Sequence, residues 1–362
     1  INNVKLSAEV NAYLASEKID VEAYEAVVEG LRSYTGKSLL VDMTCTNYSL
    51  VTAVPFEKVC SGVSPIVSMK AVKNKVEQDG FRAAMLRDGV AVVKFLVWLK
   101  SAVEAGGQTE ISLDERLTAL RAEQPKFKGI SFDTIVGYEA HGAIVHYEAT
   151  PETDIPVEPH GLVLIDSGAQ YLDGTTDITR TIALGELTEE QRRVYTLVLK
   201  GHIQLDICRF PAGACGSQID ALARAPMWRE GYNYMHGTGH GVGSYLNVHE
   251  GPHQIRMEWR SAPLQAGMTV TNEPGIYLEG KFGVRIENTL LIVPAETTAF
   301  GDFLKFETLT LAPIDIAPIV LEMLSAEERE WLNTYHRRVY ESLSPHLTEG
   351  EKEGLRVATL PI

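Results

Sequence analysis

Hydrophobic residues recur at helical spacing from residue 74 to residue 105, which predicts one long helix. Its apolar side chains follow one another at intervals of four, seven, three and four residues: Phe81, Met85, Val92, Phe95 and Leu99. Residues at such intervals share one face of an α-helix. Gly80 and Gly89 lie inside the pattern, and each costs a helix about 1 kcal/mol relative to alanine. Gly106 and Gly107 end it.

Capping patterns predict further helices. A serine or threonine followed three residues later by glutamate or glutamine can satisfy the first backbone N–H groups of a helix. Such pairs begin at Ser112, Thr188 and Ser325. The last two predict helices that run to about residues 205 and 343, and another helix is expected from residue 217 to about residue 229.

The first 68 residues predict a separate α/β domain. Helical patterns cover residues 5–15 and 20–33, an apolar run at 38–43 suits a buried strand, and residues 45–55 suggest a loop with a short helix. Ser61, Gly62 and Pro65 then interrupt regular structure. We therefore expect domains at 1–68 and 69–362, the second of them with a C-terminal helical extension.

The strand pattern places the second domain in the α+β class. Apolar runs and alternating positions predict strands at 129–137, 142–149, 162–166 and 268–272. The predicted helices lie mainly before, between and after groups of these strands along the chain, which is typical of α+β proteins.

Composition narrows the class of protein. The chain of 362 residues is 45% hydrophobic, so it can bury a large core, and its formal net charge of −15 argues against nucleic-acid binding. It contains no run of 18 apolar residues, signal peptide or lipidation motif, so we expect no membrane partner. The four cysteines form no CxxC pair, which favours a reducing compartment and predicts a cytoplasmic protein.

Five side chains with metal-binding chemistry stand in distinctive local motifs. They are four carboxylates and one imidazole: Asp166, Asp177, His240, Glu273 and Glu287. Four carboxylates carry about the charge that two divalent cations neutralise, and oxygen-rich ligation with one nitrogen suits manganese, cobalt, iron or zinc. Two such ions roughly 3.5–4 Å apart can activate one shared water. The set predicts a two-metal hydrolase.

Asp166 and Asp177 are expected to meet through a hairpin. Asp166 ends the apolar run 162–166, where an ionised carboxylate is costly unless it is paired or ligating. Asp173 and Gly174 supply a turn, and Asp177 follows on the returning strand. The alternative is that one of these aspartates only caps a helix or stabilises a turn.

His236 and His240 stand four residues apart, but glycines between and after them make a zinc-protease helix improbable. A glycine-rich strand or loop is expected there instead. Glu273 ends the strand 268–272, where Pro274 forces a turn. Arg285 and Glu287 alternate with Ile286 and should share one strand face, although they could also form a simple surface ion pair.

The longer motifs resemble the pita-bread metallopeptidases, which include methionine aminopeptidase, prolidase and aminopeptidase P. The resemblance is strongest to eukaryotic cytosolic aminopeptidase P (X-prolyl aminopeptidase) and extends from about residue 38 to the end. Four runs carry it: GAIVHYEATPET (142–153), LIDSGAQYLDGTTDITRT (164–181), YMHGTGHGVGSYLNVHEGP (234–252) and NEPGIYLEGKFGVRIEN (272–288).

This resemblance implies a fold and also which domains of the family the chain contains. The fold would be a curved antiparallel sheet with helices on its convex side. Members of the family have two creatinase-like domains ahead of the catalytic one, so residues 1–68 would be the remnant of the second and the first would be missing. We also expect a homodimer, and a cleaved N-terminal fragment of the same protein could remain bound.

The resemblance also implies roles for the site residues. All five candidate ligands would bind two divalent ions, with manganese the first choice, and Glu287 would bridge them. Glu273 would accept the proton of a metal-bridged hydroxide and later deliver it to the departing nitrogen. The residues around the substrate would be His146 and His249, which stabilise the tetrahedral intermediate or transfer protons, and His236, Arg285 and Tyr277, which line the proline pocket.

The predicted activity is removal of the first residue from Xaa-Pro-Yaa peptides. Proline makes the scissile amide tertiary and fixes its ring, so a dedicated pocket is needed. The alternatives are a prolidase that acts on Xaa-Pro dipeptides, a truncated and catalytically impaired form, and a non-catalytic binding module. Methionine aminopeptidase and metal-free creatinase chemistry fit the motifs less well.

Overall fold

The computed structural model describes residues 3–362. It separates into one compact unit that ends at Ser68 and another that runs from Met69 to Ile362. Among the residues described, no helix combines the length and the hydrophobicity that a membrane crossing requires.

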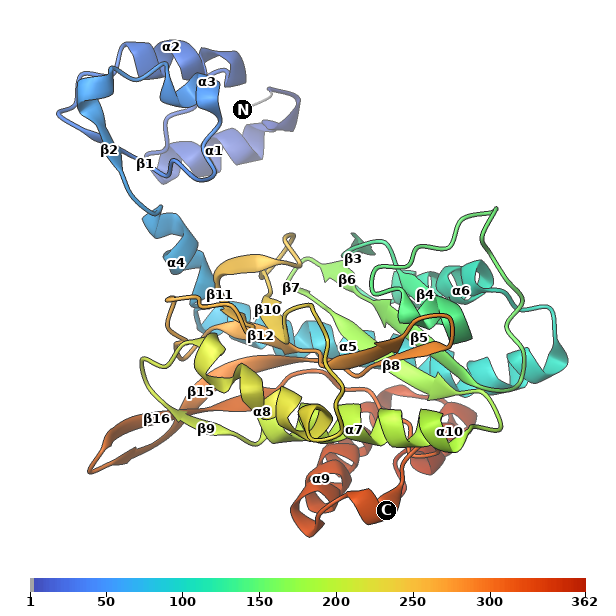
Figure 1. Cartoon of the computed structure of the whole chain (residues 1–362). Helices are drawn as coiled ribbons and strands as arrows, with labels where there is room; N and C mark the ends of the chain where they lie inside the picture. Colours follow the sequence, from blue (N-terminus) through green and yellow to red (C-terminus); the bar gives the residue numbers. More distant parts are fainter. Residues whose placement is uncertain (1–2) are drawn as a thin grey trace. The chain divides into compact units, whose positions relative to one another are not determined.

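The first unit consists of short helices around one pair of parallel strands. The helices are α1 (Ala8–Ser16), α2 (Val27–Arg32) and α3 (Tyr48–Val51), and the strands are β1 (Leu39–Val41) and β2 (Val59–Ser61) (Figure 1). The helical predictions at 5–15 and 20–33 and the strand at 38–43 are therefore confirmed in outline. The hydrophobic residues buried here, among those described, are Val41 and Val54. Helix α4 (Pro65–Ala71) follows.

The second unit is built on antiparallel strands. One six-stranded sheet has the order β11 (Glu250–Ile255), β10 (Gly239–Gly241), β12 (Thr269–Asn272), β15 (Asn288–Thr298), β16 (Gly301–Thr308) and β9 (Arg209–Pro211). A three-stranded sheet has the order β4 (Ile135–Tyr138), β5 (Leu162–Ser167) and β8 (Ile178–Ala183). Smaller groups are β3 (Phe127–Ile130) with β6 (Ala169–Tyr171) and β7 (Gly174–Thr175), and β13 (Gly275–Leu278) with β14 (Phe282–Arg285).

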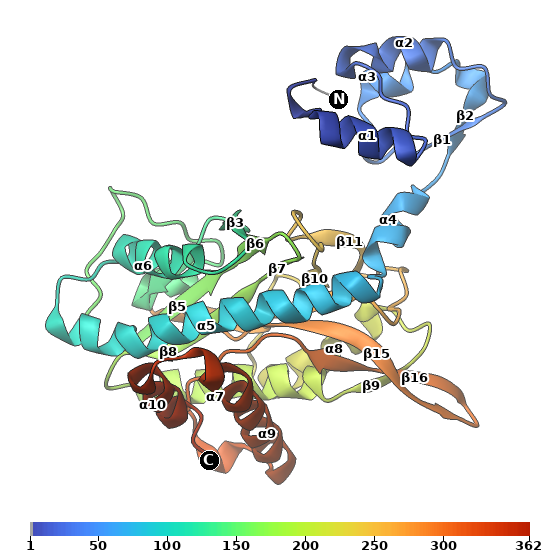
Figure 2. The same ribbon diagram turned by 180° about the vertical axis from the view of Figure 1, so that it is seen from behind.

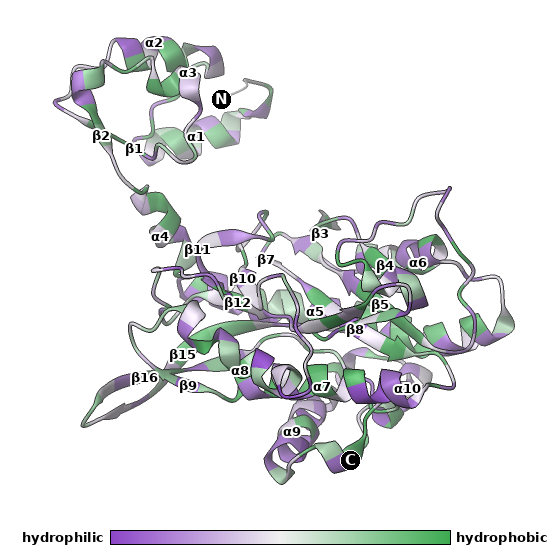
Figure 3. Ribbon diagram, viewed as in Figure 1, coloured by the Kyte–Doolittle hydropathy of each residue, from purple (hydrophilic) through white to green (hydrophobic). Residues whose placement is uncertain are grey.

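Helices cover these sheets, so the predicted α+β class is confirmed. They are α5 (Lys75–Ala105), α6 (Glu110–Ala122), α7 (Glu189–Asp206), α8 (Gly216–Trp228), α9 (Ala326–Leu343) and α10 (Glu349–Ala358). Figure 2 shows α5 running lengthwise along the unit, and its apolar residues pack with those of β5 and β8. Along α7, α9 and α10, hydrophilic and hydrophobic residues alternate (Figure 3), as expected of helices with one buried face.

The predicted long helix is confirmed as α5, and both of its internal glycines have a packing reason, since a Cβ added at Gly80 would collide with the backbone carbonyl of Asp173. A Cβ added at Gly89 would collide with the backbone carbonyl of Leu311. The helix thus accepts the propensity cost of glycine because a neighbouring segment approaches its backbone. The helices predicted from Thr188 and Ser325 are also confirmed, each with the expected capping box.

Some local predictions were wrong, and the single strand expected over 129–137 is divided into β3 and β4. Helix α6 begins at Glu110, because Thr109 is the N-cap, and the Thr109 N–H donates a hydrogen bond to Ser112 Oγ at 2.8 Å. Residues 142–149 form no strand. The segment instead contains a 3-10 turn, Glu139–Ala143, and a further turn closed by Tyr147 N–H to the Ile144 carbonyl. Its backbone is irregular, and its apolar side chains do not share one face, because Tyr147 is buried whereas Ile144 is 53% exposed.

Candidate metal centre

The hairpin β5–β8 carries both aspartates into one cavity. Asp166 lies near the end of β5 and pairs with Thr179 of β8, whereas Asp177 directly precedes β8. Both residues are buried, with exposed fractions of 8% and 4%. The short strands β6 and β7 lie between them in sequence, so the turn at Asp173 is embedded in a second small hairpin.

His240 points a single free nitrogen at the carboxylates. It lies on the short strand β10, as the glycine-rich sequence predicted, and a Cβ at neighbouring Gly239 would collide with the Thr271 carbonyl. Its Nδ1 lies 2.9 Å from the Gly241 carbonyl oxygen, which can only accept, so Nδ1 carries the hydrogen. Nε2 then faces Asp177 Oδ2 at 3.4 Å and Glu273 Oε1 at 3.5 Å.

The two glutamates lie directly beside strands rather than within them. Glu273 follows β12, and its N–H donates to the Thr238 carbonyl. Glu287 lies in a break between β14 and β15, so the continuous strand expected over residues 285–287 is interrupted there. Its N–H donates to the Thr179 carbonyl, and its Oε2 accepts from Thr179 Oγ1 at 2.8 Å. These contacts tie Glu287 to the strand that follows Asp177.

The four carboxylates crowd together with little positive charge between them. Burial raises the pKa of Asp177 and holds the pKa of Glu287 well above its usual range, and the neighbouring carboxylates act in the same direction. Burial and Asp177 raise the pKa of Glu273 to about 7. Burial alone would lower the pKa of His240, but Asp177 and Glu273 raise it to about 9.

This arrangement fits divalent cations. Ligand atoms of Asp177, His240 and Glu287 lie within 4.8 Å of one another. Asp166 Oδ2 accepts from Arg285, at 2.7 Å from NH2, but the buried Oδ1 of the same carboxylate has no hydrogen-bond partner. An orphaned carboxylate oxygen facing other carboxylates is the environment that a bound cation would relieve.

Beside the carboxylates, three of the predicted substrate residues form one hydrogen-bonded chain. Arg285 NH1 donates to Tyr277 Oη at 2.7 Å, and Tyr277 Oη lies 2.8 Å from His236 Nε2. His236 Nδ1 faces the Gly237 carbonyl at 2.8 Å, so Nδ1 carries the hydrogen and Nε2 accepts from Tyr277. Burial and the charge of Arg285 lower the pKa of His236 to about 3, which keeps its ring neutral.

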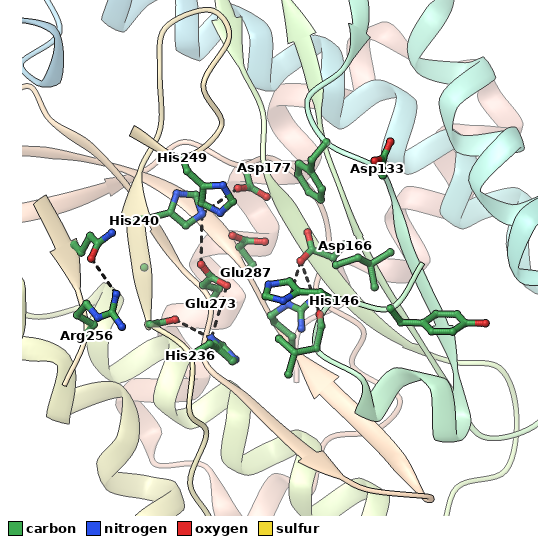
Figure 4. A pocket seen from close by; sticks show the side chains of 18 of the residues that line it. Asp133, His146, Asp166, Asp177, His236, His240, His249, Arg256, Glu273 and Glu287 are labelled. Carbon is green, nitrogen blue, oxygen red and sulfur yellow. Dashed lines mark hydrogen bonds and ion pairs between the residues drawn. The ribbon is translucent and has the colours of Figure 1, made fainter. Parts of the chain in front are cut away.

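The remaining predicted residues lie on the open side of the site. His249 packs its ring against His240, with centroids 4.2 Å apart, and desolvation together with the charge of His240 lowers its pKa to about 4. His146 lines the same cavity (Figure 4). Tyr277 does not line it, because it stands behind His236 and Arg285.

The cavity has a volume of about 430 Å³, and it brings together all five candidate ligands with His146, His236, His249 and Arg285. Its wall also contains residues that sequence reasoning missed: Phe132, Asp133, Glu148, Gln254 and Arg256. Of these, Asp133 and Arg256 are labelled in Figure 4. They stand outside any motif of known chemistry, and only their position beside the ligands makes them candidates for contact with a substrate.

Comparison with known families gives matches over almost the whole chain. Residues 79–294 match the model of metallopeptidase family M24, and residues 302–362 match the C-terminal region of peptidase M24. Residues 1–77 match the creatinase/prolidase N-terminal domain.

Curated relatives include Aminopeptidase P1 of Arabidopsis thaliana, which is 40% identical over 415 residues that include 100% of this chain and 64% of the relative. Aminopeptidase P1 of Lotus japonicus is 46% identical over 83% of this chain and 49% of its own length. The chain thus spans about half to two thirds of the length of these relatives.

Among solved structures, the X-prolyl aminopeptidase of Caenorhabditis elegans superimposes with a TM-score of 0.93 and 36% identity, over 100% of this chain and 61% of its own. That protein is described as a cytosolic enzyme with a di-nuclear active site. The prolidase of Pyrococcus furiosus superimposes with a TM-score of 0.65 and 26% identity, over 84% and 86% of the two chains.

Proposed function

The chain belongs to metallopeptidase family M24, and from that membership we propose that it removes the N-terminal residue of peptides with proline in second position. Its second unit has the pita-bread fold, a curled antiparallel sheet with helices around it. The observation that carries the proposal is the cavity in which three buried carboxylates, the half-buried Glu273 and one imidazole nitrogen converge without enough internal positive charge. The similarity to proteins named aminopeptidase P supports this substrate class.

Five residues would hold two divalent ions in this proposal: Asp166, Asp177, His240, Glu273 and Glu287. Manganese is our choice because the shell is rich in carboxylates and contains one imidazole. When bound, such a pair lowers the pKa of a water molecule held between the ions enough to make it a nucleophile near neutral pH. The relative from Caenorhabditis elegans, described as having a di-nuclear active site, supports the number of ions.

In this proposal Glu273 transfers the proton. The Glu273 carboxylate lies in the cavity with Oε1 3.5 Å from His240 Nε2. The same oxygen accepts a hydrogen bond from Thr271 Oγ1 at 3.1 Å. Glu273 takes the proton of the attacking water and gives it to the proline nitrogen as that nitrogen leaves. A carboxylate in a desolvated site is a stronger base than one in water, which suits both steps.

His146 and His249 are proposed to stabilise the negative charge that develops on the scissile carbonyl oxygen. Both line the cavity beside the candidate ligands (Figure 4), and both are exposed, so a peptide that enters the cavity can reach them. A donor already aimed at the developing oxyanion costs no reorganisation during the reaction. The ring of His249 packs against that of His240, which fixes the distance between this donor and the candidate ligand.

Proline recognition is assigned to the chain Arg285–Tyr277–His236. The amide nitrogen of an Xaa-Pro bond carries no hydrogen, so the pocket needs no acceptor for it and can present apolar surface. His236 offers the face of a neutral ring, and Tyr277 and Arg285 hold that ring in place from behind. The arrangement explains why a residue outside the cavity lining, Tyr277, belongs to the substrate site.

A prolidase acting on Xaa-Pro dipeptides is the second candidate. The structural match to the prolidase of Pyrococcus furiosus supports it, although at lower identity than the match to X-prolyl aminopeptidase. The two activities differ in the length of the peptide that the site accepts, and a dipeptide and a tripeptide of the same first residues separate them.

The proposal also includes the domains of the chain, its oligomeric state and its cellular compartment. We assign residues 1–68 to the creatinase-like domain and residues 69–362 to the catalytic domain, with support from the family match over 1–77 and from the compact units that meet after Ser68. We propose a cytoplasmic homodimer, and the description of the Caenorhabditis elegans relative as cytosolic supports the compartment.

The test is hydrolysis of Arg-Pro-Pro and of Arg-Pro by the 362-residue chain, each with and without manganese. Manganese-dependent release of arginine from the tripeptide alone is the expected result. Cleavage of the dipeptide alone would replace the proposal with prolidase activity. Absence of cleavage in protein shown to contain two metal ions would overturn the catalytic assignment for this chain and favour an impaired form or a binding module.

A further inference from the structure

His202, on helix α7, lies fully buried behind the metal centre and touches two of the segments that carry its ligands. Its Nδ1 is 3.1 Å from the carbonyl oxygen of Asn272, the residue before Glu273. The same nitrogen is 3.2 Å from the carbonyl oxygen of Ile286, the residue before Glu287. One ring nitrogen therefore contacts the backbone beside both glutamates.

The geometry defines the state of this histidine. Carbonyl oxygens can only accept, so Nδ1 carries the hydrogen and shares it between the two carbonyls. Nε2 accepts from Asn288 Nδ2 at 3.1 Å. Burial and the charge of Arg180 lower the pKa of His202 to about 3, so the ring stays neutral in this pattern of one donor and one acceptor.

Further hydrogen bonds extend this contact into a buried network. Asn272 Nδ2 donates back to the His202 carbonyl at 2.9 Å. On the other side, Asn288 Oδ1 accepts from Arg180 NH2 at 2.9 Å, and Arg180 NH1 donates to the Glu287 carbonyl at 2.6 Å. Arg180 lies on β8, the strand that follows Asp177. The network thus connects the segments of three candidate ligands from behind the cavity.

We propose that His202 is a positioning residue that sets the spacing between Glu273 and Glu287, and thereby the affinity of the centre for its second divalent ion. This inference rests on the proposed function, because it takes the two glutamates as metal ligands. Glu273 follows β12 and Glu287 lies in a break between strands, so neither glutamate lies within a strand ladder at its own position. The shared Nδ1–H is a direct link between the residues that precede them.

A pair of polar substitutions separates this role from mere packing. In His202→Asn, the amide nitrogen stands as many bonds from the backbone as Nδ1 and can still donate to the two carbonyls. In His202→Gln, the polar end lies one bond further out, near the position of Nε2, and no donor remains at the Nδ1 position. His336→Gln is the matched control, because His336 is also a buried histidine that accepts from a backbone N–H, at Ile314, away from the cavity.

The measurement is manganese binding to the full chain by equilibrium dialysis with metal analysis, without any peptide. We expect His202→Gln to weaken the second binding event by about 10–100-fold, the usual effect of losing support behind a metal ligand. We expect His202→Asn to recover most of that loss and His336→Gln to bind as the wild type does. Turnover of His202→Gln should approach the wild-type value at saturating manganese.

Wild-type manganese affinity in His202→Gln would overturn the inference. So would an equal loss in His336→Gln, since the effect would then follow from reduced stability alone. If His202→Gln does not fold, a His202→Asn variant that binds the second ion as weakly as metal-site variants do would also overturn it. Failure of the wild type to cleave Xaa-Pro peptides would remove the proposed function while leaving this comparison of affinities in place.

Discussion

The second unit, residues 69–362, encloses carboxylates in two places and neutralises them in only one of these places. On α5, Asp88 pairs with Arg121 of α6, with Nε and NH2 of the guanidinium at 2.9 and 3.1 Å from its two oxygens. Tyr171 donates to the same carboxylate at 3.1 Å. In the cavity, the four carboxylates have nearby only the guanidinium of Arg285, the imidazole of His240 and the neutral ring of His236, and one oxygen of Asp166 has no hydrogen-bond partner.

The difference indicates which buried carboxylates stabilise the fold and which bind a ligand. A carboxylate that the chain neutralises with its own arginine contributes to the fold, because removing either partner leaves the other buried and unpaired. Carboxylates that the chain leaves crowded together oppose folding until a cation from outside arrives. The first group should therefore govern stability, and the second should govern metal binding.

The largest expected effect is loss of activity in Asp177→Ala or His240→Ala. Each variant removes a ligand from the closest group of donor atoms in the cavity. Turnover of Arg-Pro-Pro should fall by at least about 10³-fold, since the acceleration of hydrolysis depends on the activated water. Metal content should be measured on the same samples. Wild-type turnover together with wild-type metal content in either variant would remove that residue from the centre.

Asp88→Ala should have the largest effect on stability. It leaves the guanidinium of Arg121, whose side chain is fully buried, without its carboxylate, and a loss of about 3–5 kcal/mol in the free energy of unfolding is expected. Urea denaturation of the metal-free protein measures it. Glu353→Ala is the control, because the exposed pair Arg356–Glu353 should leave the denaturation midpoint unchanged. Equal midpoints for Asp88→Ala and the wild type would contradict the comparison.

Glu287→Gln should stabilise the metal-free protein, whereas Asp88→Ala should destabilise it. Burial and the neighbouring carboxylates disfavour the charge of Glu287, so its neutral replacement should raise the free energy of unfolding of the metal-free protein by about 1–3 kcal/mol. The same variant should bind manganese more weakly than the wild type. A variant that is both less stable without metal and normal in metal binding would show that Glu287 belongs to the structural group instead.

The smallest expected effect is a pH dependence of the metal-free protein. The pKa of Glu273 rises from an ordinary value of 4.5 to about 7 on folding, so the folded state holds a proton that the unfolded state releases between these values. The stability of the metal-free protein should therefore fall as the pH rises from about 4.5 to about 7.

The contribution of Glu273 is the difference between the wild type and Glu273→Gln in thermal midpoints measured across that range. Because glutamine does not titrate, this difference should favour the variant increasingly as the pH rises. A constant difference from pH 4.5 to pH 7 would mean that the carboxylate titrates alike in the folded and unfolded chains.

Much of the site could be predicted because its ligands stand in local sequence patterns. The apolar run before Asp166 and the turn at Asp173 and Gly174 describe a hairpin, and the structure has that hairpin in β5–β8. Capping signals located α7 and α9 closely, since caps depend on residues three positions apart. The strand predicted over 142–149 was wrong because a short apolar run can also lie on irregular backbone, where the buried Tyr147 and the exposed Ile144 do not alternate as in a strand.

The sequence by itself thus determined the α+β class, the long helices and the set of residues with metal chemistry. Only the tertiary structure decided which unmarked residues reach the cavity, such as Asp133 and Arg256, and that Tyr277 stands behind the lining. It also placed His202 of α7 between the segments of Glu273 and Glu287, 70 or more residues away along the chain. Local patterns record contacts between near neighbours, whereas these contacts arise only when sheets and helices pack.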